Sequence, residues 1–216
     1  AVNAVYNSLR GYPDRALFLS EVRSDNIYPS NNDVARDHDP INNFAPNIAS
    51  NVYVEEAWRA DFNGIFKANT VLDQIKKNGT YVGSAALSTR LAAEAKFLRA
   101  FFYFDLVKYY GRVPIIDRPV SASEANTIAR GTVGDVYALI ISDLQFAITN
   151  LPSTYAGTFP SYGPTDVGRA TKYAAEAILA NVYMTRSGAK YGIEGAGMGL
   201  NEWSLALPLL QDIISS

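Results

Sequence analysis

Residues 94–116 constrain the fold more than any other part of the chain, because they continue a helix that is apolar on two sides. One apolar stripe recurs at steps of three and four residues and consists of Leu91, Ala95, Leu98, Phe102, Leu106 and Tyr109. Phe97, Phe101 and Phe104 mark a second stripe on another face. A helix that is apolar on two sides must be packed on two sides, so we expect it to be the central packing element of a helical fold.

The same segment predicts where this helix ends. Gly111 is placed to end it in a left-handed C-terminal cap, and Pro114 then forces an extended path through Ile115 and Ile116. No catalytic pattern lies in the segment, so it indicates architecture and not chemistry.

Composition excludes several classes of protein. Hydrophobic residues make up 48% of the 216 positions and charged residues 19%, which is typical of a folded globular chain. The formal net charge of −2 provides no basic field for nucleic acid or for an anionic membrane surface. No apolar run approaches the ~20 residues that span a bilayer. The absence of cysteine excludes disulfides, thiol nucleophiles and cysteine-ligated metal.

Both ends of the sequence indicate a piece of a longer chain. The start has no Met and lies inside an apolar-periodic segment, so we expect a trimmed or processed chain whose targeting segment is gone. At the other end, residues 203–214 predict a helix that is still under way at Ser216. We therefore expect residues 1–216 to form a single helical domain of a longer protein.

Apolar periodicity and capping signals place the helices. Three helices are expected at about residues 2–11, 53–77 and 84–110. Three more are expected to begin at the Thr132–Asp135 capping pair, at Thr171 and at about residue 201, and the first two of these to end at about 151 and 188. The last three start at offsets in the thirties, close to the ~34-residue period of a tetratricopeptide hairpin. The expected fold is all-α, with tetratricopeptide-like helical hairpins, long irregular loops and few or no strands.

Glu94 and Arg99 on the central helix could be a catalytic acid and an electrophile, or a structural pair of charges. They lie five residues apart and do not face each other on one helix. We therefore predict that each has a partner on a neighbouring helix, and for Arg99 we expect a carboxylate such as Asp61 or Asp73.

Two short motifs carry oxygen donors. The run Ser24-Asp25-Asn26 could bind metal or sugar, but its residue types equally favour a turn or a helix cap. The run 37–39, Asp-His-Asp, invites a metal interpretation, and with Asn42 it could serve calcium, but the distal Glu of a calcium loop is missing. We predict turns and solvated or locally hydrogen-bonded side chains, with no metal and no cofactor.

Patterns for nucleophilic catalysis and phosphate binding are missing. No Gly-x-Ser-x-Gly elbow occurs, and residues 192–199 contain four glycines without a following Lys-Ser/Thr, so they predict a flexible loop. Both tryptophans, Trp58 and Trp203, lie in predicted helices and are expected in the core. Nothing singles out a catalytic pair of carboxylates.

Four motifs follow one another along nearly the whole chain: Glu21-Val-Arg-Ser-Asp-Asn-Ile-Tyr28, Trp58-Arg-Ala-Asp-Phe-Asn-Gly-Ile-Phe-Lys-Ala-Asn69, Glu94-Ala-Lys-Phe-Leu-Arg-Ala with Tyr109-Tyr-Gly-Arg-Val-Pro114, and Gly168-Arg-Ala-Thr-Lys-Tyr-Ala-Ala-Glu-Ala-Ile-Leu-Ala-Asn-Val-Tyr183. In this order they resemble the SusD/RagB-like family of Bacteroidetes outer-membrane lipoproteins. The resemblance implies a surface-exposed outer-membrane lipoprotein that captures an oligosaccharide and passes it to a SusC-like TonB-dependent transporter. It implies no enzymatic activity. Family members are longer and begin with a lipidated Cys, so the chain would be the N-terminal helical domain.

Under this resemblance the sugar site is expected in loops, because in starch-binding relatives the loop after the first helix contributes to it. Aromatic side chains cover the apolar faces of sugar rings, and polar side chains bond their hydroxyls. Loops 31–44 and 155–162, whose aromatic residues we expect to be exposed, supply the candidates Arg36, His38, Asp39, Asn42, Asn43, Phe44, Tyr155, Phe159 and Tyr162. Loop 31–44 contains no Trp. The alternatives for both loops are plain solvated connections and contacts with the transporter.

Two other functions compete with glycan capture. One is a tetratricopeptide-like scaffold that binds only a peptide or protein, and the other is an all-helical glycoside hydrolase. Long loops rich in Asn and Tyr favour glycan capture over the scaffold, since scaffolds usually keep their turns short. Cleavage of oligosaccharides would distinguish the hydrolase.

Overall fold

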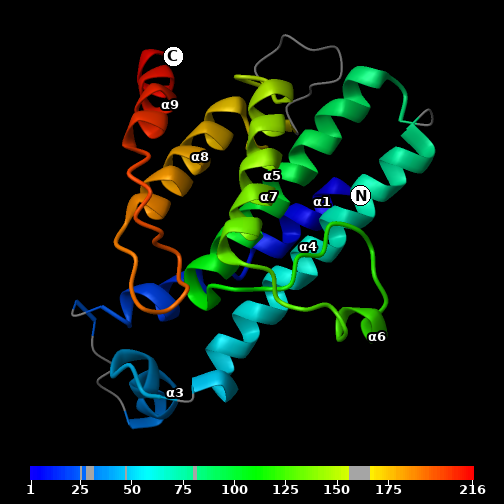
Figure 1. Ribbon diagram of the computed structural model, residues 1–216. Coiled ribbons are helices and arrows are strands. Elements are labelled where there is room, and N and C mark those ends of the chain that lie inside the picture. Colours follow the sequence, from blue (N-terminus) through cyan, green and yellow to red (C-terminus); the bar gives the residue numbers. More distant parts are fainter. Residues whose placement is uncertain (25, 28–31, 47, 80–81, 156–165) are drawn as a thin grey trace.

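Five long helices form a stack in which consecutive helices lie side by side and run in opposite directions (Figure 1). The computed structural model describes residues 1–24, 26–27, 32–46, 48–79, 82–155 and 166–216, with the backbone alone for residues 32–36. In chain order the helices are α1 Val2–Tyr6, α2 Tyr12–Ala16, α3 Asn32–Asn42, α4 Val52–Asn78, α5 Ala85–Tyr110, α6 Ala122–Ala125, α7 Val133–Asn150, α8 Lys172–Ser187 and α9 Trp203–Ser215, with 3-10 turns Asn7–Leu9 and Ile48–Ser50 and a π-helical turn Leu17–Glu21.

The predicted all-α class is confirmed, since the described residues form helices and a single isolated bridge, between Pro114 and Arg130. The predicted caps also form. Thr132 and Asp135 make a complete capping box at the start of α7, and Thr171 caps α8. Ser84, which was predicted only as the approximate start of its helix, caps α5. These caps satisfy backbone N–H groups that a first helical turn cannot pair, which is why the sequence places these helix starts to within a residue or two.

The helix α5 is central, as its two apolar stripes predict. It packs against α4 on one side and α7 on the other, and both stripes contribute to the main core. Gly111 follows it with φ 64° and ψ −107°, so the positive φ that glycine tolerates is confirmed, although the ψ is not that of a regular left-handed turn.

Buried polar and charged side chains connect α4, α5 and α7. The Arg99 guanidinium donates to both carboxylate oxygens of Asp143 on α7, at 2.7 and 2.9 Å, and to Asn69 Oδ1 on α4 at 2.7 Å. It also donates to the Asp117 carbonyl at 3.1 Å, while the Asn69 amide donates to the Ile116 carbonyl at 2.8 Å. Arg99 therefore has its partner on a neighbouring helix as predicted, but that partner is Asp143.

The two carboxylates proposed for Arg99 are engaged elsewhere. Asp61 faces Arg15, and Asp73 pairs with Lys77 one turn along α4. Glu94 accepts from Arg169, which precedes α8, at 2.9 Å, and lies 3.6 Å from Arg90 on its own helix. Both charges of the central helix are thus structural.

The segment between α2 and α4 departs from the sequence-based expectation. Residues 32–42 were predicted as part of a polar loop but form α3, with Pro40 inside its last turns. The helix is held by tertiary contacts: Ile41 is buried with Leu19 and Ala57, and the His38 ring forms a three-ring cluster with Phe18 and Tyr53. Packing of this kind overrides weak helix propensity and cannot be seen in a polar sequence.

The glycine-rich loop 192–199 packs closely, which corrects the prediction of a flexible loop. A Cβ on Gly111 would overlap the Glu194 carbonyl oxygen, and a Cβ on Gly197 would overlap the carbonyl oxygen of Ala189. The Tyr137 hydroxyl donates to the Ala196 carbonyl at 2.8 Å. Glycine is needed at position 111, where the loop backbone lies on the end of α5, and at position 197, where the loop lies on residues 188–189, whereas a Cβ at Gly192 or Gly195 would meet nothing within 4 Å.

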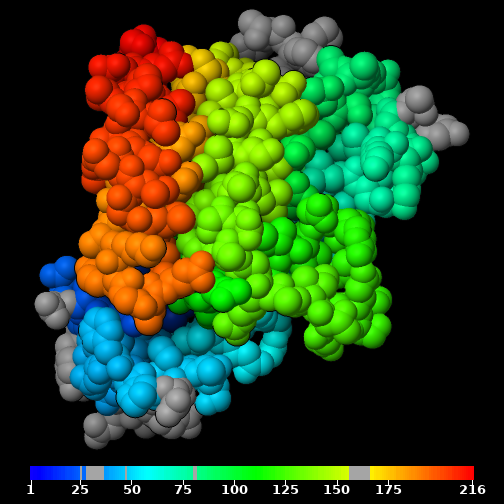
Figure 2. All heavy atoms as spheres, in the orientation of Figure 1, coloured from blue at the N-terminus to red at the C-terminus, as the bar shows by residue number. Residues whose placement is uncertain are grey.

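The outer side of α9 is apolar and uncovered. Trp203, which was predicted to be in the core, is 52% exposed, and Leu205, Leu207 and Ile214 are also exposed. Only the inner side of α9 packs on α8, and α9 lies at the edge of the molecule (Figures 1 and 2). The error arises because helical periodicity shows that a helix has an apolar face but not that a neighbour covers it. Among the described residues, no helix combines the length and the apolar character that crossing a bilayer requires.

Gly64 allows α4 and α5 to approach, and its replacement tests that contact. A Cβ at this position would lie 2.6 Å from Cζ of the buried Phe102 ring. We expect Gly64→Ala to lower the free energy of unfolding by about 1–2 kcal/mol, because overpacking costs more than the improved helix propensity returns. The matched control Gly134→Ala, whose Cβ would meet nothing closer than 3.7 Å, should be neutral or stabilising. Denaturant unfolding measures both, and a stabilised Gly64→Ala variant would refute the close contact.

Removal of Arg99 tests the buried network. We expect Arg99→Met to destabilise the fold by about 3–5 kcal/mol, since Asp143 stays buried with only Lys96 to balance its charge. Arg59→Met is the control, because Arg59 makes an exposed pair with Glu55 and its loss should cost less than about 1 kcal/mol. Equal losses in the two variants, measured by urea unfolding, would contradict the structural role assigned to Arg99.

Candidate functional site

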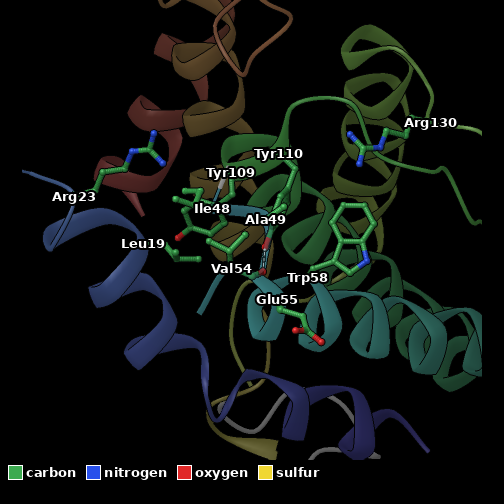
Figure 3. Close-up of a pocket in the computed structure, with 10 residues that line it drawn as sticks. All are labelled: Leu19, Arg23, Ile48, Ala49, Val54, Glu55, Trp58, Tyr109, Tyr110 and Arg130. Carbon is green, nitrogen blue, oxygen red and sulfur yellow. Dashed lines mark hydrogen bonds between the residues drawn. The ribbon is translucent and has the colours of Figure 1, made fainter. Parts of the chain in front are cut away.

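A cavity of about 420 Å³ opens at the end of the stack where the start of α4 meets the end of α5 (Figure 3). Its volume lies in the range of pockets that hold small ligands. Segments far apart in the sequence line it, and the lining residues are Leu19, Arg23, Ile48, Ala49, Val54, Glu55, Trp58, Tyr109, Tyr110 and Arg130.

Aromatic rings from two helices form one wall. Trp58 and Tyr110 meet edge to face, with centroids 5.1 Å apart, and Phe62 packs behind Trp58 at 4.7 Å. The Tyr110 hydroxyl donates to the Val54 carbonyl at 2.6 Å, which fixes the ring (Figure 3). Trp58 lies one helical turn after Val54, so α4 presents both on the side that faces the end of α5. The wall is therefore rigid before any ligand arrives.

The two tyrosines keep their protons. Burial raises the pKa of Tyr109 and of Tyr110 above the ordinary phenol value, and the nearby carboxyls of Asp105 and Asp61 raise both further. Each hydroxyl therefore stays neutral throughout the physiological pH range, and the Tyr110 hydroxyl remains a hydrogen-bond donor.

Charged side chains stand around the aromatic wall. Arg23 follows the π-helical turn and Arg130 precedes α7, and the two lie at opposite ends of the group in Figure 3. The Arg23 guanidinium lies 4.8 Å from the centroid of the Phe44 ring, and that of Arg130 lies 5.8 Å from the Trp58 ring. Glu55, the one carboxylate in the lining, pairs with Arg59 on the same helix.

Two buried carboxyl groups lie near the aromatic wall. Asp61 on α4 and Asp105 on α5 face each other and are almost fully buried, with Arg15 at 3.5 Å from Asp61 and Lys108 at 3.2 Å from Asp105. Burial, together with the neighbouring carboxylate, raises the pKa of Asp61 to about 8. Burial also raises the pKa of Asp105, although Lys108 opposes the shift. The pair therefore retains a proton at neutral pH.

Several of the predicted site residues hold the N-terminal segment in place. His38 is buried against aromatic rings, and the Asn42 amide donates to the Val22 carbonyl at 2.8 Å and to the Ile27 carbonyl at 3.3 Å. Asp39 is partly buried on α3, and its carbonyl accepts from the backbone N–H of Asn43, which is exposed. None of these side chains lines the cavity, but Asn42 positions the segment that carries Arg23.

Phe44 is the predicted residue nearest to the cavity. It is 61% exposed, has φ 51°, and stacks against Arg23, which lines the cavity. Arg36 lies on α3, with its side chain outside the described part of the structure. In the run 24–26, the Ser24 hydroxyl accepts from the Asn26 N–H at 3.2 Å, and Asp25 lies outside the described residues.

The second predicted loop contributes nothing described to this cavity. Tyr155, expected to be exposed, is buried, and its hydroxyl donates to the Ala170 carbonyl at 2.9 Å. The expectation was wrong because the ring fills the gap before α8. Phe159 and Tyr162 lie outside the described residues.

Sequence reasoning missed most of the cavity lining. Trp58 was assigned to the core, but it is only partly buried, with one side packed and the other in the cavity. The sequence did contain a signal for this wall. A Trp near the start of a long helix and a Tyr-Tyr pair at the end of another are large amphipathic side chains close to helix ends. Arg23 and Arg130 gave no such signal. Among the described side chains, no three acidic or histidine groups gather as a metal site would require.

Comparison with known proteins agrees with this architecture. Residues 7–184 match the SusD-like family described as "Starch-binding associating with outer membrane". The chain belongs to the SusD-like family. The resemblance of the four sequence motifs is thereby confirmed.

Individual SusD-like proteins match over nearly the whole chain. SusD-like protein P25 of Formosa agariphila is 27% identical over 88% of this chain and 34% of its own. The structure of a laminarin-binding SusD-like protein superposes with a TM-score of 0.73 and 26% identity, over 98% of this chain and 41% of its own. A structure solved with xylogluco-oligosaccharide superposes with a TM-score of 0.71 and 26% identity, over 98% of this chain and 37% of the other. The chain thus spans less than half the length of each.

The carboxyl pair near the cavity predicts a pH-dependent stability. Because the folded state holds Asp61 protonated up to about pH 8 and the unfolded state releases that proton near pH 4, the folded state binds more protons in between. The contribution of Asp61 to the free energy of unfolding should therefore be largest below about pH 4–5 and should fall as the pH rises towards 8. Asp61→Asn should flatten this slope.

Urea unfolding at pH 5, 6.5 and 8 measures the effect. Asp73→Asn is the control, since Asp73 lies on the same helix, pairs with Lys77 and is partly exposed. Its profile should run parallel to that of the unaltered protein. A profile for Asp61→Asn that also ran parallel would show that the buried pair does not hold the proton.

Proposed function

We propose that the chain is the oligosaccharide-binding part of a cell-surface protein, and that the sugar lies against Trp58 and Tyr110 in the cavity between α4 and α5. The observation that carries this proposal is a rigid aromatic wall with charged side chains beside it, in a SusD-like fold. Sugar rings have apolar faces edged by hydroxyls, and this combination of side chains matches both.

The dimensions suit more than one sugar unit. A second cavity of about 530 Å³ also has Trp58 in its lining, together with Phe66, Pro114 and Ile116. An oligosaccharide could extend from one cavity to the other past the indole. The laminarin-binding protein and the structure with xylogluco-oligosaccharide support glycan as the ligand class.

Delivery to a transporter is the second part of the proposal. The family description couples starch binding with association to the outer membrane. We infer that the whole protein stands at the cell surface and hands its glycan to a TonB-dependent transporter of the SusC-like type. The side chains around the cavity serve binding and not bond cleavage, so we assign no enzymatic activity.

The uncovered apolar side of α9 favours contact with another polypeptide as a second candidate function. Trp203, Leu207 and Ile214 lie on this helix and are more than half exposed. An apolar helix face of this kind is a surface on which a protein partner can pack. This surface is separate from the cavity, so the two functions are compatible.

Replacement of Trp58 tests glycan binding at the cavity. We expect Trp58→Ala to weaken binding of the best ligand from a glycan array about 10- to 100-fold, since burying an aromatic ring contributes about 1.5–3 kcal/mol. Trp203→Ala removes the other Trp, on α9, and should bind as the unaltered protein does. Isothermal titration calorimetry measures both, with circular dichroism to show that each variant is folded.

Two outcomes would contradict the proposal. Unchanged affinity in a folded Trp58→Ala variant would remove the cavity as the glycan site. Release of shorter oligosaccharides on incubation with the unaltered protein would show a hydrolase.

A further inference from the structure

We propose that the cavity beside Trp58 takes an acidic saccharide, one that bears carboxylate or sulfate groups, and that Arg23 and Arg130, which stand at opposite ends of the lining, each bind such a group. The inference rests on the proposed function and narrows it, because it names the chemical class of glycan. It follows from which arginines of the chain have carboxylate partners and which do not.

Most of the arginines whose side chains the structure describes are already paired with a carboxylate. Eight have an acidic partner within 4 Å: Arg15, Arg59, Arg90, Arg99, Arg112, Arg118, Arg169 and Arg186. Arg10, Arg23 and Arg130 make no ion pair within the described residues, and two of these three, Arg23 and Arg130, line the same cavity. In a chain of net charge −2, two unneutralised arginines at one cavity are a local excess of positive charge.

The remaining charge in the lining does not cancel this excess. Glu55 is the cavity's one carboxylate, and it is held by Arg59, which lies four residues further along α4 and outside the cavity lining. Among the described residues, the cavity lining therefore contains two guanidinium groups that make no ion pair and one carboxylate that Arg59 neutralises. Such an imbalance favours an anionic ligand over a neutral one, most strongly at low ionic strength.

Both arginines extend from backbone that is held in place. The segment before Arg23 is fixed by the Asn42 amide, which bonds the Val22 carbonyl, and the guanidinium rests on the Phe44 ring. The carbonyl of Arg130 accepts from Arg112 at 3.3 Å, and Arg130 pairs with Pro114 in the isolated bridge. Positions held in this way lose little freedom when a ligand binds.

The chemistry of the two side chains suits an acidic group on a sugar. A guanidinium presents parallel N–H donors that match the oxygens of a carboxylate or a sulfate. Because the Arg130 guanidinium already lies 5.8 Å from the centre of the Trp58 ring, a sugar ring placed against the aromatic wall would bring its acidic substituent close to an arginine. A free inorganic anion would gain nothing from the aromatic wall, and a neutral sugar would gain little from the charge.

Matched pairs of saccharides that differ only in charge test the inference. The probes are oligogalacturonate against its methyl-esterified form, and carrageenan oligosaccharides against their desulfated form, each titrated into the full chain. We expect the acidic member of at least one pair to bind at least 10-fold more tightly at low salt. This preference should shrink as NaCl is raised to 0.5 M.

Charge-neutralising variants locate the preference. Arg23→Gln and Arg130→Gln should each lower the preference for the acidic member at least threefold, and Glu55→Gln should raise it. The control Lys76→Gln removes the same charge from α4 about 27 Å along the helix axis from Trp58, which is beyond two screening lengths at about 0.1 M salt, and should change nothing when the variants are compared at that salt concentration.

The remaining outcomes separate this inference from the proposed function. Equal binding of acidic and neutral members, or a preference that survives in the double variant Arg23→Gln/Arg130→Gln, would overturn the inference and leave glycan binding intact. Binding of neutral glycans alone on the array would overturn it in the same way. Absence of binding to any saccharide, acidic or neutral, would overturn the proposed function and the inference with it.

Discussion

The fold depends on the buried guanidinium of Arg99 more than on any other single group. One planar side chain satisfies a carboxylate on α7, an amide on α4 and a carbonyl of the segment that follows α5. These bonds fix three helices and one connection relative to each other in a region where an unpaired charge would be very costly. The same connection continues to Arg130, so the position of one side of the cavity follows from a contact in the core.

Much of the helical framework could be predicted from local signals. The capping box at Thr132, the caps at Ser84 and Thr171 and the stripes of α5 each depend on residues within a turn or two, and they specified helix starts and the central position of α5. The helix α3 could not be predicted, because it owes its stability to contacts of Ile41 and His38 with residues outside it. The predicted partner of Arg99 was wrong for a similar reason, because spacing along one helix does not tell which neighbouring helix lies opposite a given residue.

The candidate site was harder to predict than the fold. Its lining comes from five separate segments, which only the packing of α4 against α5 brings together. Loop composition pointed to residues 31–44. Of the side chains that the structure describes there, Asn42 and Phe44 support the site without forming its wall. Trp58 was taken for core because an amphipathic ring at the end of a buried stripe has the same periodicity as a wholly buried one. The unpaired arginines of the lining became visible only in the structure, where eight other arginines have carboxylate partners.

The contact between the glycine-rich loop and the end of α5 has a consequence for the order of folding. Gly111 and the Glu194 carbonyl touch across more than eighty positions of sequence, so the end of the helix that carries Tyr109 and Tyr110 is covered only after α7 and α8 have been added. Contacts of such long range form late and slow the overall rate. During synthesis from the N-terminus, the aromatic end of α5 would stay open to water, and to other chains, until the residues after α8 have been made. The region proposed for ligand is thus also the part of the nascent chain most in need of protection.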